Sequence, residues 1–133
     1  IARTRALYRW ETDDLDHRRF AFVKVTQQVG QDIIHQIWMY KWGWGRYVPP
    51  MPVLELRPIR GHAYCQGYSK IVLTYDDSTQ LVLLHELAHA MRGGSVRNPH
   101  TPWFVKRYIA LMHFWFEWDR EELEFQAMSR GLI

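Results

Sequence analysis

The amino-acid sequence predicts a single α+β domain, in which a small antiparallel or mixed β-sheet packs on one central helix with further helices before and after it. Three segments carry this prediction: a run of β-forming residues at 70–75, and two segments with apolar residues at helical spacing, 77–92 and 101–118. The chain has 133 residues, of which 47% are hydrophobic and 23% charged. These proportions are typical of one soluble globular domain, so residues 1–133 are expected to form a single unit.

The first 39 residues contain two patterns of different period. Residues 5–10 partly alternate polar with apolar side chains, which predicts a first strand. From Asp14 to Met39 the apolar side chains recur every three or four residues, which favours one long amphipathic helix or two shorter helices separated near Gly30. A strand over residues 20–25 is the alternative for part of this region. The apolar positions of the helical pattern are Phe22, Val25, Val29, Ile33 and Ile37.

The middle of the chain alternates turn signals with strand signals. Glycines and prolines between Lys41 and Pro52 predict a loop that contains tryptophan. Residues 53–59 are expected to form a strand, and Pro58 places it at the edge of a sheet or marks its end. Residues 61–67 predict a turn or a second hairpin arm, and residues 70–75 are the clearest strand.

Two helices are expected after this strand. The first begins at Asp77 or Ser78 as N-cap and ends at the Gly93-Gly94 pair. Its apolar stripe consists of Leu81, Leu84, Ala88 and Met91. The second begins with Thr101 as the cap and Pro102 as the first helical residue. Its packed face consists of Phe104, Tyr108, Leu111, Trp115 and Trp118. Residues 119–129 are expected to continue this helix or to form a separate one.

Charge and composition restrict the partners and the compartment. The net charge of +3 is spread along the chain without a run of five like charges, which disfavours nucleic acid as a partner. The single cysteine, Cys65, excludes an internal disulfide and a cysteine-based zinc ribbon. The apolar stretches are shorter than the ~20 residues that span a membrane, and no basic-then-apolar leader opens the sequence. We therefore expect a cytoplasmic protein without a membrane partner.

The chemistry-bearing motif is His85-Glu86-Leu87-Ala88-His89, within the first of the two helices. Residues four apart lie one above the other on a helix, so His85 and His89 are placed to bind one ion. Zinc with three protein ligands keeps a fourth position for water and lowers the pKa of that water to roughly 7. Glu86 is placed to accept the proton of the water and to pass it to the leaving amine. The motif therefore predicts a zinc site of the metallopeptidase kind.

A third ligand is required, and His100 is the favoured candidate. It lies eleven positions after His89 at the start of the next helix, and a glycine-containing loop can bring it back over the first helix. His113 is the rival, but it lies inside an aromatic helix face. Carboxylates at Glu117 and at Glu121 or Glu122 are the remaining alternatives.

These residues resemble the zincin superfamily of metallopeptidases, and most closely the SprT-like and WLM-like peptidases and a group of small metallopeptidase-like proteins of actinobacteria and their phages. The resemblance covers about residues 70–115: a strand at 70–75, the segment 82–89 with the histidine motif, and a later His-x-x-x-Phe at His100 to Phe104.

The resemblance implies a minimal zincin-like domain whose metal-proximal strand is a sheet edge that pairs with an extended peptide or protein substrate. It implies that His85, His89 and His100 bind Zn²⁺ and that Glu86 is the catalytic acid and base. The chain departs from the SprT-like pattern in having Thr101 where glycine commonly follows the third histidine, and in lacking a cysteine ribbon. It departs from the metzincin pattern at Arg92 and Ser95.

Three functions follow as hypotheses. The first is a zinc-dependent peptidase, whose oxyanion-stabilising residue the sequence leaves open among Tyr75, Arg97, Tyr108 and His113. The second is a metal-stabilised structural or virion-associated module without catalysis, with phage or virion partners. The third is nucleic-acid binding through Lys106, Arg107 and Arg120. A catalytic role of Cys65 as a nucleophile is disfavoured, because no base partner for its thiol is recognisable in the sequence.

Overall fold

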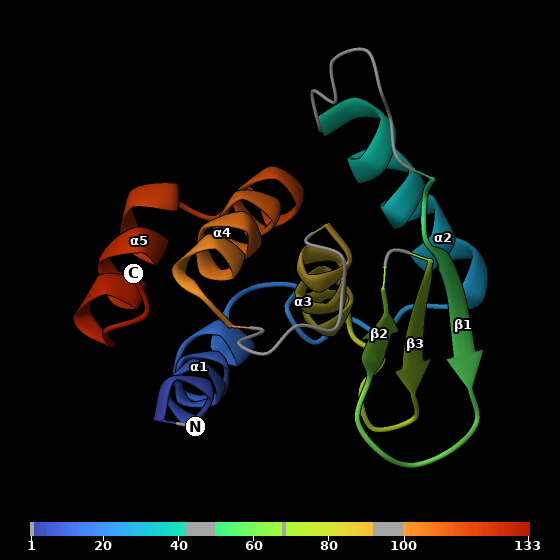
Figure 1. Ribbon diagram of the computed structural model, residues 1–133, viewed down its shortest axis with the longest axis horizontal. Helices are drawn as coiled ribbons and strands as arrows, with labels where there is room; N and C mark the ends of the chain where they lie inside the picture. The colour runs from blue at the N-terminus through green and yellow to red at the C-terminus, as the bar shows by residue number, and fades with distance from the viewer. Residues whose placement is uncertain (1, 42–49, 68, 92–99) are drawn as a thin grey trace.

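The structure is a computed structural model that describes residues 2–41, 50–67, 69–91 and 100–133. Over these ranges the chain forms five α-helices and a three-stranded sheet, which confirms the α+β class (Figure 1). The helices are α1 (Ala2–Asp13), α2 (Gln27–Gln36), α3 (Gln80–Met91), α4 (Pro102–Phe116) and α5 (Arg120–Ser129). A 3-10 turn η1 (Leu15–His17), a π-helical turn η2 (Ile37–Lys41) and the strands β1 (Val53–Arg57), β2 (Tyr64–Gln66) and β3 (Lys70–Thr74) complete the list.

The sheet is mixed, with the order β1-β3-β2. β1 runs parallel to β3, and β2 runs antiparallel to it, so that Leu54 and Cys65 both lie opposite Ile71. The predicted strands at 53–59 and 70–75 and the second hairpin arm are confirmed. β1 is an edge strand, as Pro58 indicated, whereas β3 is central.

Helix α3 lies between the sheet on one side and α1 and α4 on the other, and α5 lies outside α4 (Figure 1). This position explains why α3 is buried almost all round, although the sequence predicted a single apolar stripe. Its N-cap differs from the predicted Asp77 or Ser78, because the Thr79 hydroxyl accepts the hydrogen bond from the backbone N–H of Val82 at 3.2 Å. The buried apolar residues are Leu81, Leu83, Leu84, Leu87, Ala88 and Ala90.

The prediction of a strand at residues 5–10 was wrong, because this segment lies within helix α1. Leu7 and Trp10, three residues apart, are both fully buried, as helical spacing requires. The indole N–H of Trp10 donates to the Gln126 side chain of α5 at 3.0 Å, which fixes α1 against the C-terminal helix.

The region predicted as a long helix from Asp14 to Met39 is helical mainly in its second half. Helix α2 begins after Thr26, whose hydroxyl accepts from the N–H of Val29 at 3.2 Å. The predicted break near Gly30 was wrong: Gly30 lies inside α2, where a Cβ atom would overlap the Leu54 side chain of β1. The alternative strand at 20–25 is reduced to one isolated bridge between Lys24 and Thr79.

The C-terminal helices begin where the sequence predicted. Thr101 caps α4 by accepting from the Phe104 N–H, and Pro102 occupies the first turn. The helix ends at Phe116, because Glu117 adopts a left-handed conformation with φ of 61°. Trp118 therefore lies beyond the helix rather than on its face, and its ring stacks on Phe116 at 4.2 Å. Helix α5 is a separate helix with Asp119 as its cap.

Some predictions fall outside the described residues. These include most of the tryptophan-containing loop, the Gly93-Gly94 helix end, and the positions Arg92, Ser95 and Arg97. In the ranges that the structure describes, no helix combines the length and the apolar character needed to cross a membrane.

Candidate metal centre

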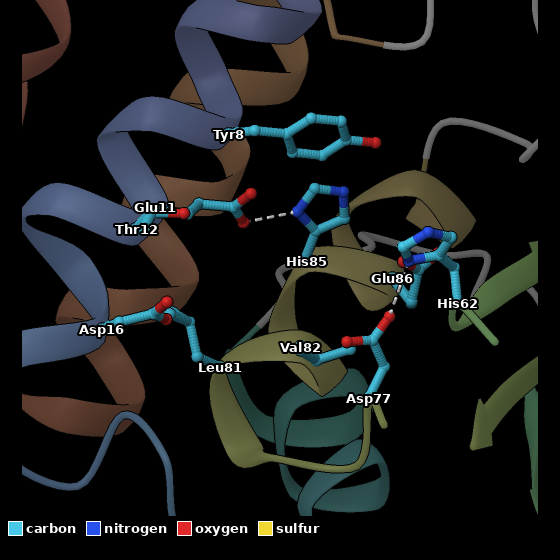
Figure 2. A pocket seen from close by; sticks show the side chains of 10 residues that line it. All are labelled: Tyr8, Glu11, Thr12, Asp16, His62, Asp77, Leu81, Val82, His85 and Glu86. Atoms are coloured by element: carbon cyan, nitrogen blue, oxygen red, sulfur yellow. Dashed lines mark hydrogen bonds and ion pairs between the residues drawn. The ribbon is translucent and has the colours of Figure 1, made fainter. Parts of the chain in front are cut away.

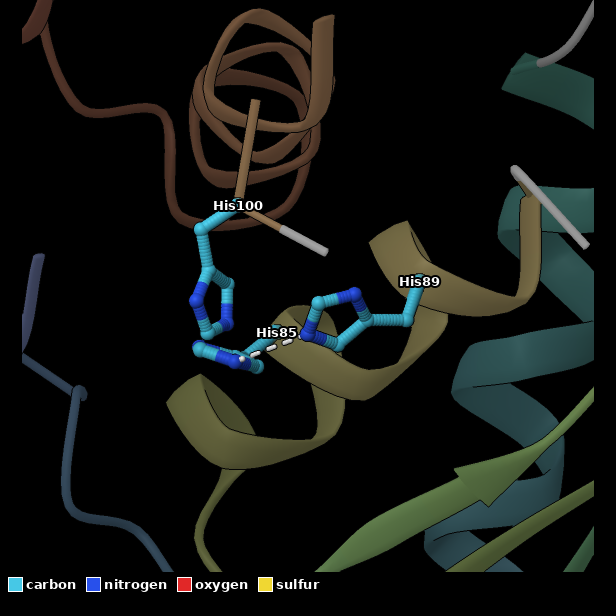
Figure 3. Close-up of side chains that lie close together, drawn as sticks. All are labelled: His85, His89 and His100. Carbon is cyan, nitrogen blue, oxygen red and sulfur yellow. Dashed lines mark hydrogen bonds between the residues drawn. The ribbon is translucent and has the colours of Figure 1, made fainter. Parts of the chain in front are cut away.

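Three histidines converge at the boundary between α3 and α4. His85 and His89 project from successive turns of α3, and His100 lies directly before α4 (Figure 3). One potential ligand atom from each ring lies within 4.8 Å of those of the other two. The structure thus brings together the three residues that the sequence selected as ligands. His85 and His100 are buried, and His89 is partly buried.

The nitrogen atoms of this cluster suit a small tetrahedral ion. The Nε2 atoms of His85 and His89 are 3.2 Å apart. Two nitrogens bound at about 2.0–2.1 Å to one tetrahedral zinc lie about 3.3 Å apart, so the pair needs little rearrangement. The Nδ1 atoms of His85 and His100 have other partners, which leaves Nε2 of each ring for an ion. A histidine-only site of this geometry fits zinc.

Phe104 fixes the orientation of all three rings. Its side chain is fully buried on the first turn of α4. The His89 ring stacks on it with centroids 4.3 Å apart, and the rings of His85 and His100 meet it edge-on at 5.1 Å each. An apolar ring among three imidazoles limits their rotation and excludes water from one side of the cluster.

Glu11 of α1 holds His85 from behind (Figure 2). One carboxylate oxygen of Glu11 accepts hydrogen bonds from His85 Nδ1 at 2.7 Å and from the Tyr108 hydroxyl at 2.8 Å. Burial alone would raise the pKa of Glu11, but the charge and hydrogen bond of His85 lower it overall. Burial would lower the pKa of His85, whereas Glu11 raises it to about 9. Burial and Glu11 together hold the pKa of Tyr108 well above its usual value.

His100 has a different, largely neutral environment. Its Nδ1 lies 3.1 Å from the Thr4 hydroxyl, which can accept the Nδ1 proton when Nε2 is free to bind an ion. Arg3 donates to the backbone carbonyl oxygens of His100 and Leu132, which fixes the segment before α4. Burial, His85 and Arg3 lower the pKa of His100 to about 4, only partly opposed by Glu11.

Glu86 lies beside the cluster and points into a cavity of about 310 Å³ (Figure 2). Its side chain is 8% exposed, and it forms no hydrogen bond or ion pair with a described residue. Burial raises the pKa of Glu86, and the negative charges of Glu11 and Asp77 raise it further against the opposing charge of His85. A carboxyl group with a raised pKa that lines a cavity beside a candidate metal site is suited to proton transfer.

The rival ligands lie away from the cluster. His113 is exposed and donates from Nδ1 to the Trp118 carbonyl at 2.8 Å. The carboxylates of Glu117, Glu121 and Glu122 are exposed near the end of α4 and the start of α5. None of these four residues belongs to the group that could hold an ion in the described parts of the chain.

The described residues that the sequence offered for oxyanion stabilisation and for nucleophilic attack are also poorly suited to these roles. The Tyr75 side chain is 65% exposed beyond the end of β3, and the Tyr108 hydroxyl is already engaged by Glu11. Cys65 donates to the Gly67 carbonyl at 3.1 Å. Burial, with a smaller effect of Glu86, raises the pKa of its thiol to about 12, so that the reactive thiolate is disfavoured.

The sequence reasoning missed the contribution of α1. Thr4, Tyr8 and Glu11, at steps of four and three, occupy one face of this helix and all lie at the histidine cluster or its cavity. The same spacing was present in the sequence as a helical signal, together with the apolar pair Leu7 and Trp10. The partly alternating pattern at residues 5–10 favoured a strand instead, so this helical spacing was not recognised.

Comparison with known proteins adds no family assignment. The scan against protein-family models, the search of curated proteins and the search of solved structures each find no match. The candidate metal centre therefore rests on its own geometry and on the motif residues.

Proposed function

We propose that the protein is a zinc-dependent metallopeptidase of the zincin type, with His85, His89 and His100 as ligands and Glu86 as the catalytic acid and base. One observation carries the proposal: the three imidazoles converge so that one ring nitrogen of each lies within 4.8 Å of those of the other two, and Glu86 lines a cavity beside them. A purely structural zinc site is normally closed by four protein ligands, whereas three histidines leave a position for water and substrate.

The residues of the chain divide the chemistry among them. When bound, zinc supplies a Lewis acid that activates water and polarises the substrate carbonyl. Glu86 accepts the proton of the attacking water, and its raised pKa helps it to return this proton to the departing amine. Glu11 and Thr4 accept the Nδ1 protons of His85 and His100, which orients the Nε2 atom of each ring towards the position that an ion would occupy.

The two edges of the sheet differ in a way that supports an extended substrate. The outer edge of β1 is covered by α2: Gln31 accepts from the Leu54 N–H at 2.8 Å, and Gln27 accepts from the Leu56 N–H at 3.1 Å. β2 is the other edge strand, and it lies next to α3 (Figure 1). Outside its own turn and β3, no described residue hydrogen-bonds to its backbone. A peptide strand added to β2 would run past the metal centre.

The decisive experiment compares the zinc-loaded protein with its Glu86→Gln variant on fluorogenic peptide libraries. We expect one zinc per chain in both proteins by elemental analysis. We expect hydrolysis by the native protein to be abolished by a chelator and restored by zinc. The Glu86→Gln variant should keep its metal and lose activity by about a thousandfold, because proton transfer contributes roughly 10²–10⁴ in rate.

Glu124→Gln is the matched control, since Glu124 is a glutamate of α5 that pairs with Arg120 at the surface. It should leave activity unchanged. Equal activity of the Glu86→Gln variant would contradict the proposal. A folded, zinc-loaded protein that cleaves no peptide, but melts at a lower temperature without zinc, would identify the metal-stabilised structural module instead.

A further inference from the structure

The cavity beside the histidine cluster needs a hydrogen-bond donor if it is to stabilise a developing oxyanion. It lies between α1, η1, the start of α3 and the segment before β2. Among its lining residues, uncharged or weakly basic donors come from Tyr8, Thr12 and His62. No lysine or arginine lines it within the described residues. Among the described residues, these three side chains are therefore the candidate donors.

Tyr8 has the position that the role requires. Its ring lies on α1, one turn before Glu11, and meets the His100 ring edge-on at 5.9 Å. Figure 2 shows the ring over His85, with the hydroxyl projecting past it on the side away from Glu11. Since Glu11 occupies Nδ1 of His85, this is the side of the ring that carries Nε2. The hydroxyl thus lies on the metal-facing side of the cavity that contains Glu86.

The Tyr8 hydroxyl is also chemically available. Its residue is 52% exposed, and the hydroxyl makes no hydrogen bond with any residue that the structure describes. A tyrosine hydroxyl is protonated at neutral pH, so this group can donate a hydrogen bond to a substrate oxygen.

The two other candidates are less well placed. His62 has a side chain that is 99% exposed, and its Nδ1 lies 3.4 Å from a carboxylate oxygen of Asp77. Thr12 follows Glu11 on α1 and is exposed. Neither side chain makes a ring contact with a histidine of the cluster, whereas Tyr8 does.

We propose that Tyr8 is a catalytic residue whose hydroxyl donates a hydrogen bond to the oxyanion formed at the scissile carbonyl. This inference rests on the proposed peptidase function and names a further residue of the same site. The proton stays on Tyr8 throughout, so the group stabilises charge while Glu86 alone transfers the proton. Donors of this kind contribute roughly 10²–10³ in kcat when they are removed from comparable sites.

The test is Tyr8→Phe, which deletes the hydroxyl and keeps the ring against His100. We expect kcat to fall about a hundredfold, while KM, zinc affinity and melting temperature stay within error of the native values. Tyr75→Phe is the matched control, because Tyr75 is an exposed tyrosine outside the cavity. It should match the native protein in every measurement. His62→Gln, measured in parallel, should lose less than Tyr8→Phe.

A binding measurement separates this proposal from the proposed function. A phosphinic peptide, whose tetrahedral oxygens imitate the oxyanion, should bind the zinc-loaded native protein and bind the Tyr8→Phe variant about a hundredfold more weakly. If the native protein is active and the variant equals it, the Tyr8 proposal alone is overturned. The Tyr8 proposal is also overturned if His62→Gln lowers kcat more than Tyr8→Phe does, or if the Tyr8→Phe variant loses its zinc. If the native protein neither cleaves peptides nor binds the phosphinic peptide, both proposals fail.

Discussion

His85 and His100 belong to one cluster but are held by opposite kinds of partner. His85 donates from Nδ1 to the partly buried carboxylate of Glu11, which also accepts from Tyr108. The Nδ1 of His100 meets only the neutral hydroxyl of Thr4. Against the effect of burial, Glu11 raises the pKa of His85 to about 9. Burial, together with the charges of His85 and Arg3, lowers the pKa of His100 to about 4.

This difference assigns different tasks to the two rings. A carboxylate behind an imidazole makes it a stronger donor to a metal and fixes its tautomer, and in the metal-free protein it holds a proton. A hydroxyl orients the ring with little effect on its charge. In the proposed zinc site, His85 would therefore be the ring with the stronger electrostatic support, and His100 would be oriented by the Thr4 hydroxyl.

Removing the charge of Glu11 should have the largest effect on the difference between His85 and His100. In Glu11→Gln, His85 loses its ionic partner, so we expect zinc affinity to fall by about tenfold or more, measured by competition with a chelating dye. The free energy of unfolding of the metal-free protein should fall by about 2 kcal/mol at pH 6.5, because a buried charged hydrogen bond is weakened. The control Glu124→Gln should change neither the zinc affinity nor the free energy of unfolding. An unaltered zinc affinity in Glu11→Gln would contradict a role of Glu11 in strengthening the binding of zinc by His85.

The pH dependence of the metal-free protein should show the two histidines as separate limbs. His85 has a folded pKa of about 9, above its unfolded value, so its stabilisation is complete below about 6.5 and is lost as the pH rises through 9. His100 has a folded pKa of about 4, so the stability that depends on its neutral form is present above about 6.5 and is lost as the pH falls towards 4. The free energy of unfolding should therefore be greatest near neutral pH.

Denaturant titrations with a chelator present, between pH 4.5 and 9.5, would measure both limbs. Each limb involves one proton and has a steepest slope of about 1.4 kcal/mol per pH unit. Glu11→Gln should flatten the alkaline limb more than the acid limb, and His100→Gln should flatten the acid limb more than the alkaline limb. If either variant changed both limbs equally, the rings would have to be treated as one coupled group.

Thr4→Val should have the smallest effect. It removes one neutral hydrogen bond to His100 while keeping the shape of the side chain, so the free energy of unfolding should fall by about 1 kcal/mol. Zinc affinity should fall severalfold, less than in Glu11→Gln. Thr12→Val provides the same substitution on the same helix at an exposed position and should be neutral in both measurements. A larger loss in Thr4→Val than in Glu11→Gln would contradict the stronger electrostatic support of His85.

The convergence of the three histidines could be predicted from sequence because their geometry is mostly local. His85 and His89 are four residues apart on one helix, and helical geometry alone places them together. His100 required only that the chain return to α3, and Thr101 with Pro102 already marked the start of the next helix. The strands at 53–57 and 70–74 were also evident from their β-branched and aliphatic residues.

The supporting residues could not be predicted because their interactions are not local. Nothing within residues 5–10 records that Glu11 will meet His85, or that the helical face of Thr4 and Tyr8 has a partner. Gly30 misled for a similar reason: it resembles a helix breaker in isolation, but in the fold it allows α2 to approach Leu54. In both segments, residues 5–10 and the region around Gly30, tertiary contacts determine a structure that differs from the one the local sequence pattern predicts.

The contacts around Glu11 also have a kinetic consequence. Glu11 is 74 residues from His85 and 97 from Tyr108, so both contacts join parts of the chain that are far apart in sequence. Contacts of high sequence separation form late, because the entropy of closing long loops opposes them. An unfolded chain can offer zinc the adjacent pair of α3 early, but full affinity must await the docking of both ends of the chain. The rate at which tight zinc binding appears during refolding would therefore time the completion of the fold rather than the formation of its helices.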